Sequence, residues 1–154
     1  MALVLRPDDE RLTWQGAISL HRQGGWTMPW RIPFEQRALY PPLGLHERAS
    51  MPAGVRISFH TDSHAIGGTI VPHPESSPID LYCDGMFHGT VDASTGEFQF
   101  DHLVDGDKLV ELWMPHTTEI RLRQLEFDGS SVEPYEDIRP KWITYGSSIS
   151  HCRQ

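Results

Sequence analysis

The sequence feature that most constrains the fold is an Asp-Gly dipeptide, Asp84-Gly85, which separates two short runs rich in apolar and aromatic residues. Asp and Gly accept the positive φ angles that both central residues of a two-residue type I′ turn require. The dipeptide therefore predicts an antiparallel hairpin over residues 79–91. Its register pairs Tyr82 with Phe87, so we expect the two rings on the same face of the hairpin.

Further runs have the alternating or β-rich composition of short strands. These runs are Leu12–Leu20, Val55–His60, Ala65–Val71, Phe98–Phe100, Lys108–Met114 and Glu119–Phe127. In the last run the apolar residues change phase near Arg123 and Gln124, which predicts a β-bulge there. Together with the hairpin, these runs predict about eight or nine strands.

Two stretches fit this pattern less well. Residues 26–34 contain two prolines and are expected to be extended or irregular chain, at best an edge strand. Residues 35–51 have room for one or two helical turns but are interrupted by Pro41-Pro42 and Gly44. We therefore expect this second stretch to be mostly a long loop.

The composition favours an all-β fold. The 154 residues include 13 Gly, 12 Pro and 5 Trp, with many β-branched residues and few Ala or Lys. A chain of this length builds one core rather than two. We predict an antiparallel β-sandwich of the jelly-roll type, similar in shape to a carbohydrate-binding module.

Charge and the N-terminal sequence exclude several functions. Acidic residues outnumber basic ones by 21 to 13, giving a formal net charge of −8, so the field that attracts nucleic acid is absent. Residues 1–10 contain neither a basic leader nor an apolar run long enough for a signal peptide or a membrane span. We expect a cytoplasmic protein without a membrane span. Cys83 and Cys152 imply no disulfide framework.

The C-terminal part of the sequence changes character. Residues 131–140 are rich in acidic residues and proline and are predicted to be an interdomain linker after a sandwich of residues 1–130. Residues 141–154 then begin with an apolar and β-branched run that leads into Gly146-Ser147-Ser148. A buried strand that ends in such a turn presents a hydroxyl at its carboxyl end, where α/β enzymes keep a nucleophile.

This last block resembles the first block of the SGNH (GDSL-type) hydrolases, in which a strand leads into Gly-Asp-Ser-Ile or Gly-Asp-Ser-Leu. The resemblance implies that Ser148 is the nucleophile position of a lipase, acylhydrolase or other esterase, or of an acyltransferase. Ser147 stands where the family has Asp, which removes a carboxylate that braces the turn. The family supplies its oxyanion Gly and Asn and its Asp-x-x-His pair from later blocks, whereas only His151 follows Ser148 here.

The resemblance extends over nearly the whole chain, because some two-domain SGNH proteins carry an N-terminal β-sandwich before the hydrolase domain. It implies a non-catalytic N-terminal domain truncated just after the first catalytic block. We expect Ser148 to be inert in these 154 residues, since a serine nucleophile needs a base and oxyanion donors. The expected partner is the chain's own C-terminal hydrolase domain, and no cofactor is expected.

Aromatic residues are the candidates for binding. Tyr82 and Phe87, together with Trp26 and Trp30, could stack a sugar ring, although aromatic residues in a sandwich are more often part of the core. For Trp26 and Trp30 we favour contacts with the hydrolase domain, because a proline-braced aromatic loop is a stiff docking surface. The alternative function is a free-standing carbohydrate-binding module with a glycan as partner.

A metal site is the weakest hypothesis. His60, Asp62 and His64 form the closest cluster, but on a strand or turn this spacing does not bring the ligands together. The His-x-His element of a cupin-like metal enzyme is absent, so we expect no metal.

Overall fold

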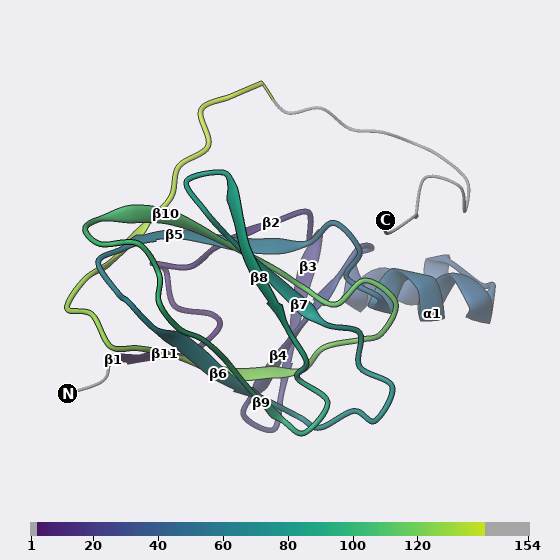
Figure 1. Ribbon diagram of the computed structural model, residues 1–154. Coiled ribbons are helices and arrows are strands. Elements are labelled where there is room, and N and C mark those ends of the chain that lie inside the picture. The colour runs from purple at the N-terminus through teal and green to yellow at the C-terminus, as the bar shows by residue number, and fades with distance from the viewer. Residues whose placement is uncertain (1–2, 141–154) are drawn as a thin grey trace.

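In the computed structural model, which describes residues 3–140, two six-stranded antiparallel sheets pack face to face (Figure 1). The first sheet has the order β3-β4-β11-β6-β9, with β1 paired to β11. Its strands are β1 (Leu3–Leu5), β3 (Ser19–Gln23), β4 (Trp26–Trp30), β6 (Ile66–Ile70), β9 (Glu97–Phe100) and β11 (Leu122–Phe127). The second sheet has the order β12-β5-β10-β7-β8, with β2 paired to β5. Its strands are β2 (Thr13–Gln15), β5 (Arg56–Thr61), β7 (Ile79–Cys83), β8 (Met86–Val91), β10 (Lys108–Trp113) and β12 (Val132–Pro134).

The core lies between the two sheets and confirms the predicted all-β sandwich. Val55, Ile57 and Phe59 are fully buried, as the alternation in their run predicts. Phe59 of the second sheet contacts Phe127 of the first edge to face, with ring centroids 5.3 Å apart. Burial of such side chains, worth roughly 1.5–3 kcal/mol each, is what holds the two sheets together.

The predicted hairpin is present with the predicted turn. Asp84 and Gly85 have φ angles of 48° and 77°, and Tyr82 pairs with Phe87. The predicted β-bulge is confirmed as well, because the register between β11 and β6 shifts between Leu122 and Gln124. Both features depend on local sequence, which is why the sequence predicts them.

The run Leu12–Leu20 is two strands rather than the one predicted. β2 pairs with β5 of the second sheet, whereas β3 pairs with β4 of the first. The chain changes sheets at Gly16, whose φ of 82° is left-handed. A Cβ atom at Gly16 would lie 2.7 Å from the carbonyl oxygen of Gly54, so only glycine fits this crossing.

Residues 26–34 also differ from the prediction, because their first half is not an edge strand. β4 lies between β3 and β11, although it pairs with β11 only at Thr27. Gly24 and Gly25 form the two-residue turn between β3 and β4, with φ angles of 54° and 80°. Alternation from this turn makes Pro29 part of a non-hydrogen-bonded pair with β3, so its missing N–H removes no bond there.

Residues 35–51 are more helical than predicted. They form a 3₁₀-helix, η1 (Phe34–Leu39), and an α-helix, α1 (Leu43–Ser50). The prolines do not break these helices, because Pro33 and Pro42 lie immediately before them, where no helical N–H is needed. Within the described residues, no helix is both long and apolar enough to span a membrane.

The C-terminal end of helix α1 contacts the end of β4. Ala49 of α1 is buried together with Met28 and Trp30 in a small second cluster, apart from the main core. The backbone N–H of Arg31 donates to the carbonyl oxygen of Ala49 over 2.9 Å and ties the strand to the helix.

The segment predicted to be the linker begins as part of the sandwich. β12 pairs with Phe59–Thr61 of β5, on the same edge that β2 uses at Arg56–Ser58. Val132 is buried at 3% exposure. The described chain then continues over this edge, the yellow trace above β5 and β10 in Figure 1.

Candidate functional site

The strand register aligns outward-facing side chains of the second sheet in two neighbouring rows. From β2 to β8 the first row contains Gln15, Arg56, Trp113, Asp80 and Thr90. The second row contains Thr13, Ser58, Glu111, Tyr82 and Phe87. Paired residues of adjacent strands point to the same side of a sheet, so these side chains share one surface. We call this surface the exit face, because the last described residues cross it.

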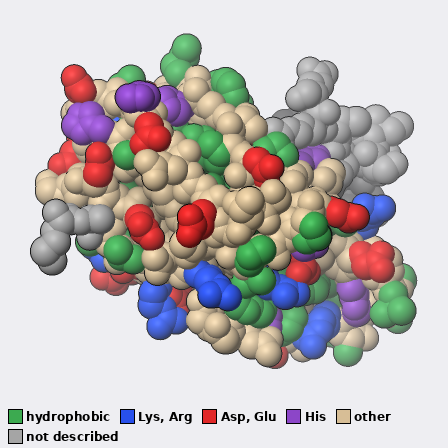
Figure 2. Space-filling view, turned by 60° about the horizontal axis from the view of Figure 1, so that its bottom comes forward, with side chains coloured by type: hydrophobic (Ala, Val, Ile, Leu, Met, Phe, Trp, Pro, Cys, Tyr) green, Lys and Arg blue, Asp and Glu red, His purple; other side chains and the backbone are tan. Residues whose placement is uncertain are grey.

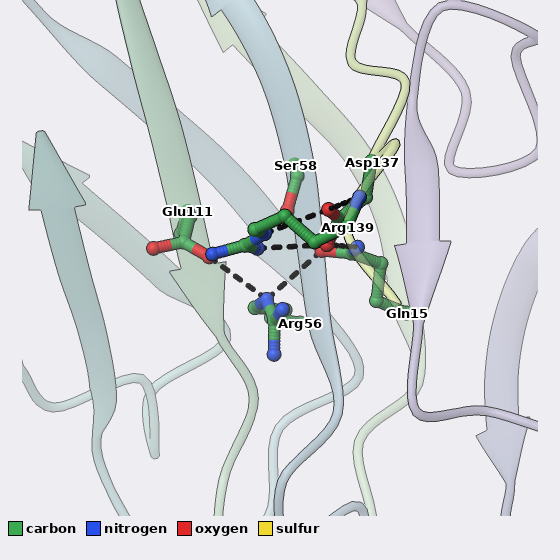
Figure 3. Close-up of polar contacts among 6 residues, drawn as sticks. All are labelled: Gln15, Arg56, Ser58, Glu111, Asp137 and Arg139. Atoms are coloured by element: carbon green, nitrogen blue, oxygen red, sulfur yellow. Dashed lines mark hydrogen bonds and ion pairs between the residues drawn. The ribbon is translucent and has the colours of Figure 1, made fainter. Parts of the chain in front are cut away.

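Gln15 is the centre of the polar half of the exit face (Figure 3). Its Oε1 accepts hydrogen bonds from Nε of Arg56 at 2.9 Å and from the hydroxyl of Ser58 at 2.8 Å. Its Nε2 donates to Oδ2 of Asp137 at 3.2 Å. Ser58 is fully buried, so its hydroxyl depends on Gln15 for an acceptor.

Asp137 fixes the end of the described chain to this half of the face. Its two carboxylate oxygens accept from Nε and Nη2 of Arg139, both at 2.7 Å. These hydrogen bonds hold the pKa of Asp137 well below its ordinary value. The carboxylate is therefore charged at neutral pH and bridges Arg139 to Gln15.

Arg56 joins the polar half to the aromatic half. Its Nε lies 2.9 Å from Oε1 of Glu111, and both side chains are about four-fifths buried. Its guanidinium also lies over the ring of Trp113, 4.8 Å from the ring centroid. Arg56 thus contacts both the carboxylate of Glu111 and the ring of Trp113. Its positive charge is compensated by Glu111 at the boundary between the polar and the aromatic half.

The aromatic half consists of Trp113, Tyr82 and Phe87. Tyr82 lies 6.2 Å from Trp113 and 5.4 Å from Phe87 between ring centroids. Phe87 is 59% exposed, whereas Nε1 of Trp113 is buried without a hydrogen-bond partner in the described chain. Tyr82 and Trp113 border a small hollow of about 150 Å³.

A second hollow lies on the outer side of the first sheet. It has a volume of about 490 Å³ and is lined by His21, Gln23, Gly24, Trp26, Met28, Trp30, Phe34, Glu119 and Arg121. The aromatic side chains here contact one another. The ring centroids of His21 and Phe34 are stacked 3.7 Å apart, and those of Phe34 and Trp30 lie 5.1 Å apart.

Figure 2 shows the side of the first sheet, where hydrophobic side chains are scattered among charged ones and basic side chains gather along the lower part of the view.

The four predicted binding residues therefore form two pairs. Tyr82 and Phe87 lie together on the exit face, whereas Trp26 and Trp30 line the hollow of the first sheet. The structure does not join the pairs into one aromatic platform. Ser148 lies outside the described residues.

Sequence reasoning missed Gln15, Arg56, Trp113 and Asp137. The alternation of residues 108–114 could have identified Trp113 as a surface residue, because it puts this side chain on the face opposite the core. The neighbours of Trp113 depend on the order of strands β5, β10 and β7, which no local pattern reveals.

The histidines singled out from the sequence contact acidic loop residues instead of one another. Nδ1 of His60 lies 3.4 Å from Asp107, and Nε2 of His64 lies 3.1 Å from Asp105. Residues 3–140 contain no group of three or more His, Cys, Asp or Glu side chains placed to hold a metal ion.

Comparisons with known proteins identify the relatives of this architecture. The family model described as SsfX3, N-terminal domain, matches residues 12–123. A solved structure of the salicylyl-acyltransferase SsfX3, from a tetracycline biosynthetic pathway, is similar with a TM-score of 0.81 and 33% identity. The match covers 90% of this chain and 43% of that chain, so this chain spans less than half of the acyltransferase. No curated protein sequence matches.

Two more distant structures share the fold. A GDSL-like lipase from Bacteroides ovatus matches with a TM-score of 0.67 and 18% identity, over 89% of this chain and 44% of that chain. A family two carbohydrate esterase from Cellvibrio japonicus matches with a TM-score of 0.60 and 13% identity, over 89% of this chain and 36% of that chain. At such identities the likeness shows the fold alone.

Proposed function

Since this chain belongs to the family of SsfX3 N-terminal domains, we propose that it is the accessory β-sandwich of a two-domain SGNH (GDSL-type) enzyme. The enzyme transfers an acyl group to an acceptor or hydrolyses an acyl ester. The observation that carries the proposal is the family match over residues 12–123, with a relative whose chain extends far beyond the matched part. The sandwich includes β12, so we place the domain boundary near residue 140 rather than at 130.

The catalytic chemistry belongs to the domain that begins after this boundary. Ser148, at the end of the Trp-Ile-Thr-Tyr-Gly-Ser-Ser block, attacks the acyl carbonyl while a histidine from the later sequence takes its hydroxyl proton. The backbone N–H of Ser148 stabilises the oxyanion, and the bond to the leaving group then breaks as the histidine returns the proton to that group. The acyl-enzyme passes its acyl group to water or to the acceptor. The sandwich supplies none of these groups, and its role is to fold, to dock and to hold the catalytic domain in place.

The test is ester hydrolysis by the gene product that continues beyond Gln154. We expect turnover of p-nitrophenyl acetate by that longer protein and none by the 154 residues alone, because we assign the base of the serine to the later sequence. Ser148→Ala abolishes turnover, whereas Ser147→Ala, the neighbouring hydroxyl, serves as the matched control and retains turnover. Full activity of Ser148→Ala would refute the assignment of the nucleophile.

The second candidate function is glycan binding by the sandwich itself. It is favoured by Phe87, which is 59% exposed and lies beside Tyr82, a residue that borders the small hollow. Sugar rings stack on such surfaces. Glycan-array binding by the 154 residues that disappears in Tyr82→Ala, with no esterase activity from the longer protein, would favour this function over the enzyme.

A further inference from the structure

We propose that the exit face is the surface on which the catalytic domain docks, with Trp113, Tyr82 and Phe87 at the centre of the contact. The inference rests on the proposed function, because it needs a second domain in the same polypeptide. It adds which of the two sheets that domain covers and which side chains it contacts.

The first argument is where the described chain leaves the sandwich. Asp137 is bonded to Gln15 on the exit face, and Arg139 is bonded to Asp137. Each further residue extends a chain by at most ~3.6 Å. A domain that starts near residue 141 therefore begins beside this face, not beside the hollow of the first sheet.

The second argument is the apolar surface that the described chain leaves uncovered. Phe87, which lies beside Tyr82 on this face, is 59% exposed. A large ring exposed next to Tyr82 and Trp113 is suited to burial by a partner.

The third argument is that the charged side chains around Gln15 already form two ion pairs. Arg56 pairs with Glu111, and Arg139 pairs with Asp137. A partner can cover these pairs without leaving a single charge buried, which is the main penalty for burying ionic groups. An arginine among aromatic side chains with a polar rim is also the usual composition of protein interfaces.

The hollow of the first sheet is a poorer docking surface, so we place the catalytic domain on the exit face rather than at Trp26 and Trp30. Trp30 is only 9% exposed, and its neighbour Phe34 is covered by His21. Trp26 has the guanidinium of Arg121 over its ring, at 5.2 Å. These three rings thus contact side chains of their own domain.

The test compares side-chain accessibility in the 154 residues and in the longer gene product by hydroxyl-radical footprinting with mass spectrometry. We expect modification of Phe87 and Trp113 to fall severalfold in the longer protein. Val4, which is 51% exposed on β1 of the other sheet, is the matched control and should be modified equally in both. Equal modification of Phe87 in the two proteins would overturn the proposal.

A variant provides an independent readout. Phe87 projects from the edge strand β8 outside the core, so Phe87→Ser should leave the sandwich folded. In the longer protein, trypsin cleavage after Lys141 should accelerate about tenfold, the change that ~1.4 kcal/mol of lost docking energy produces. Val4→Ser should leave the cleavage rate unchanged. An unchanged rate in Phe87→Ser would contradict the proposal.

The outcomes separate this inference from the proposed function. If the longer protein loses esterase activity in Ser148→Ala but Phe87 stays accessible, the enzyme assignment holds and the docking face is wrong. If the longer protein has no Ser148-dependent activity, the proposed function fails. Protection of Phe87 that depends on protein concentration would identify a second copy as the occupant. Protection that appears only with an added glycan would identify a sugar, and either result would overturn the inference.

Discussion

The crossing between the two sheets makes a quantitative prediction for Gly16→Ala. The left-handed φ of 82° costs a residue with a Cβ roughly 1–2 kcal/mol. The new Cβ would also lie 2.7 Å from the carbonyl oxygen of Gly54 and 3.3 Å from Cα of Val55. Both neighbours are backbone atoms, so the chain must shift, at a cost of about 1–3 kcal/mol by analogy with overpacked cores. The expected loss is the sum, about 2–5 kcal/mol.

Gly25→Ala is the matched control. Gly25 has nearly the same φ, 80°, but a Cβ atom there would meet nothing within 4 Å. We expect it to lose only the conformational part, ~1–2 kcal/mol. Urea unfolding of the 154 residues measures both losses from the shift in midpoint at constant slope. Equal losses for the two variants would refute the contact with Gly54 as the reason for glycine at position 16.

Two further predictions concern polar side chains. Gln15→Ala should lower the unfolding free energy by about 1–3 kcal/mol, because the buried hydroxyl of Ser58 loses its acceptor. Urea unfolding measures this loss, and a value near zero would contradict the role of Gln15. Asp62 accepts hydrogen bonds from Ser130 and the next residue, which lower its pKa below the ordinary value of 3.8. A pKa that is lower in the folded state means that the charged carboxylate stabilises the fold above about pH 3.8. This stabilisation disappears as the pH falls and the carboxylate becomes protonated. The stability difference between wild type and Asp62→Asn should therefore shrink below about pH 4, and a pH-independent difference would contradict this assignment.

The sequence predicted those parts of the fold that depend on neighbouring residues. Asp84-Gly85 determines its turn through φ angles, and the bulge in β11 is visible as a change of phase. The crossing at Gly16 was missed because an alternating run continues through it without a break. Pro41-Pro42 predicts an interruption of the helix, whereas the position of Pro42 immediately before α1 makes it compatible with the helix.

The candidate site was only half predictable for the same reason. Tyr82 and Phe87 belong to one hairpin, so the turn fixes their contact. Trp113 joins them only because β10 lies between β5 and β7. Gln15 meets Asp137 across 122 positions of sequence, a contact that depends on how β2 and β12 share one edge of β5.

The most direct test of the account is covalent labelling of the longer gene product with a fluorophosphonate, followed by peptide mass spectrometry. The account predicts one label, on Ser148, that appears in the longer protein and in its Ser147→Ala variant but not in Ser148→Ala. It also predicts no label on the 154 residues alone, because the account assigns the base that activates the serine to the later sequence. A label on another serine, or a longer protein that takes no label, would contradict the account.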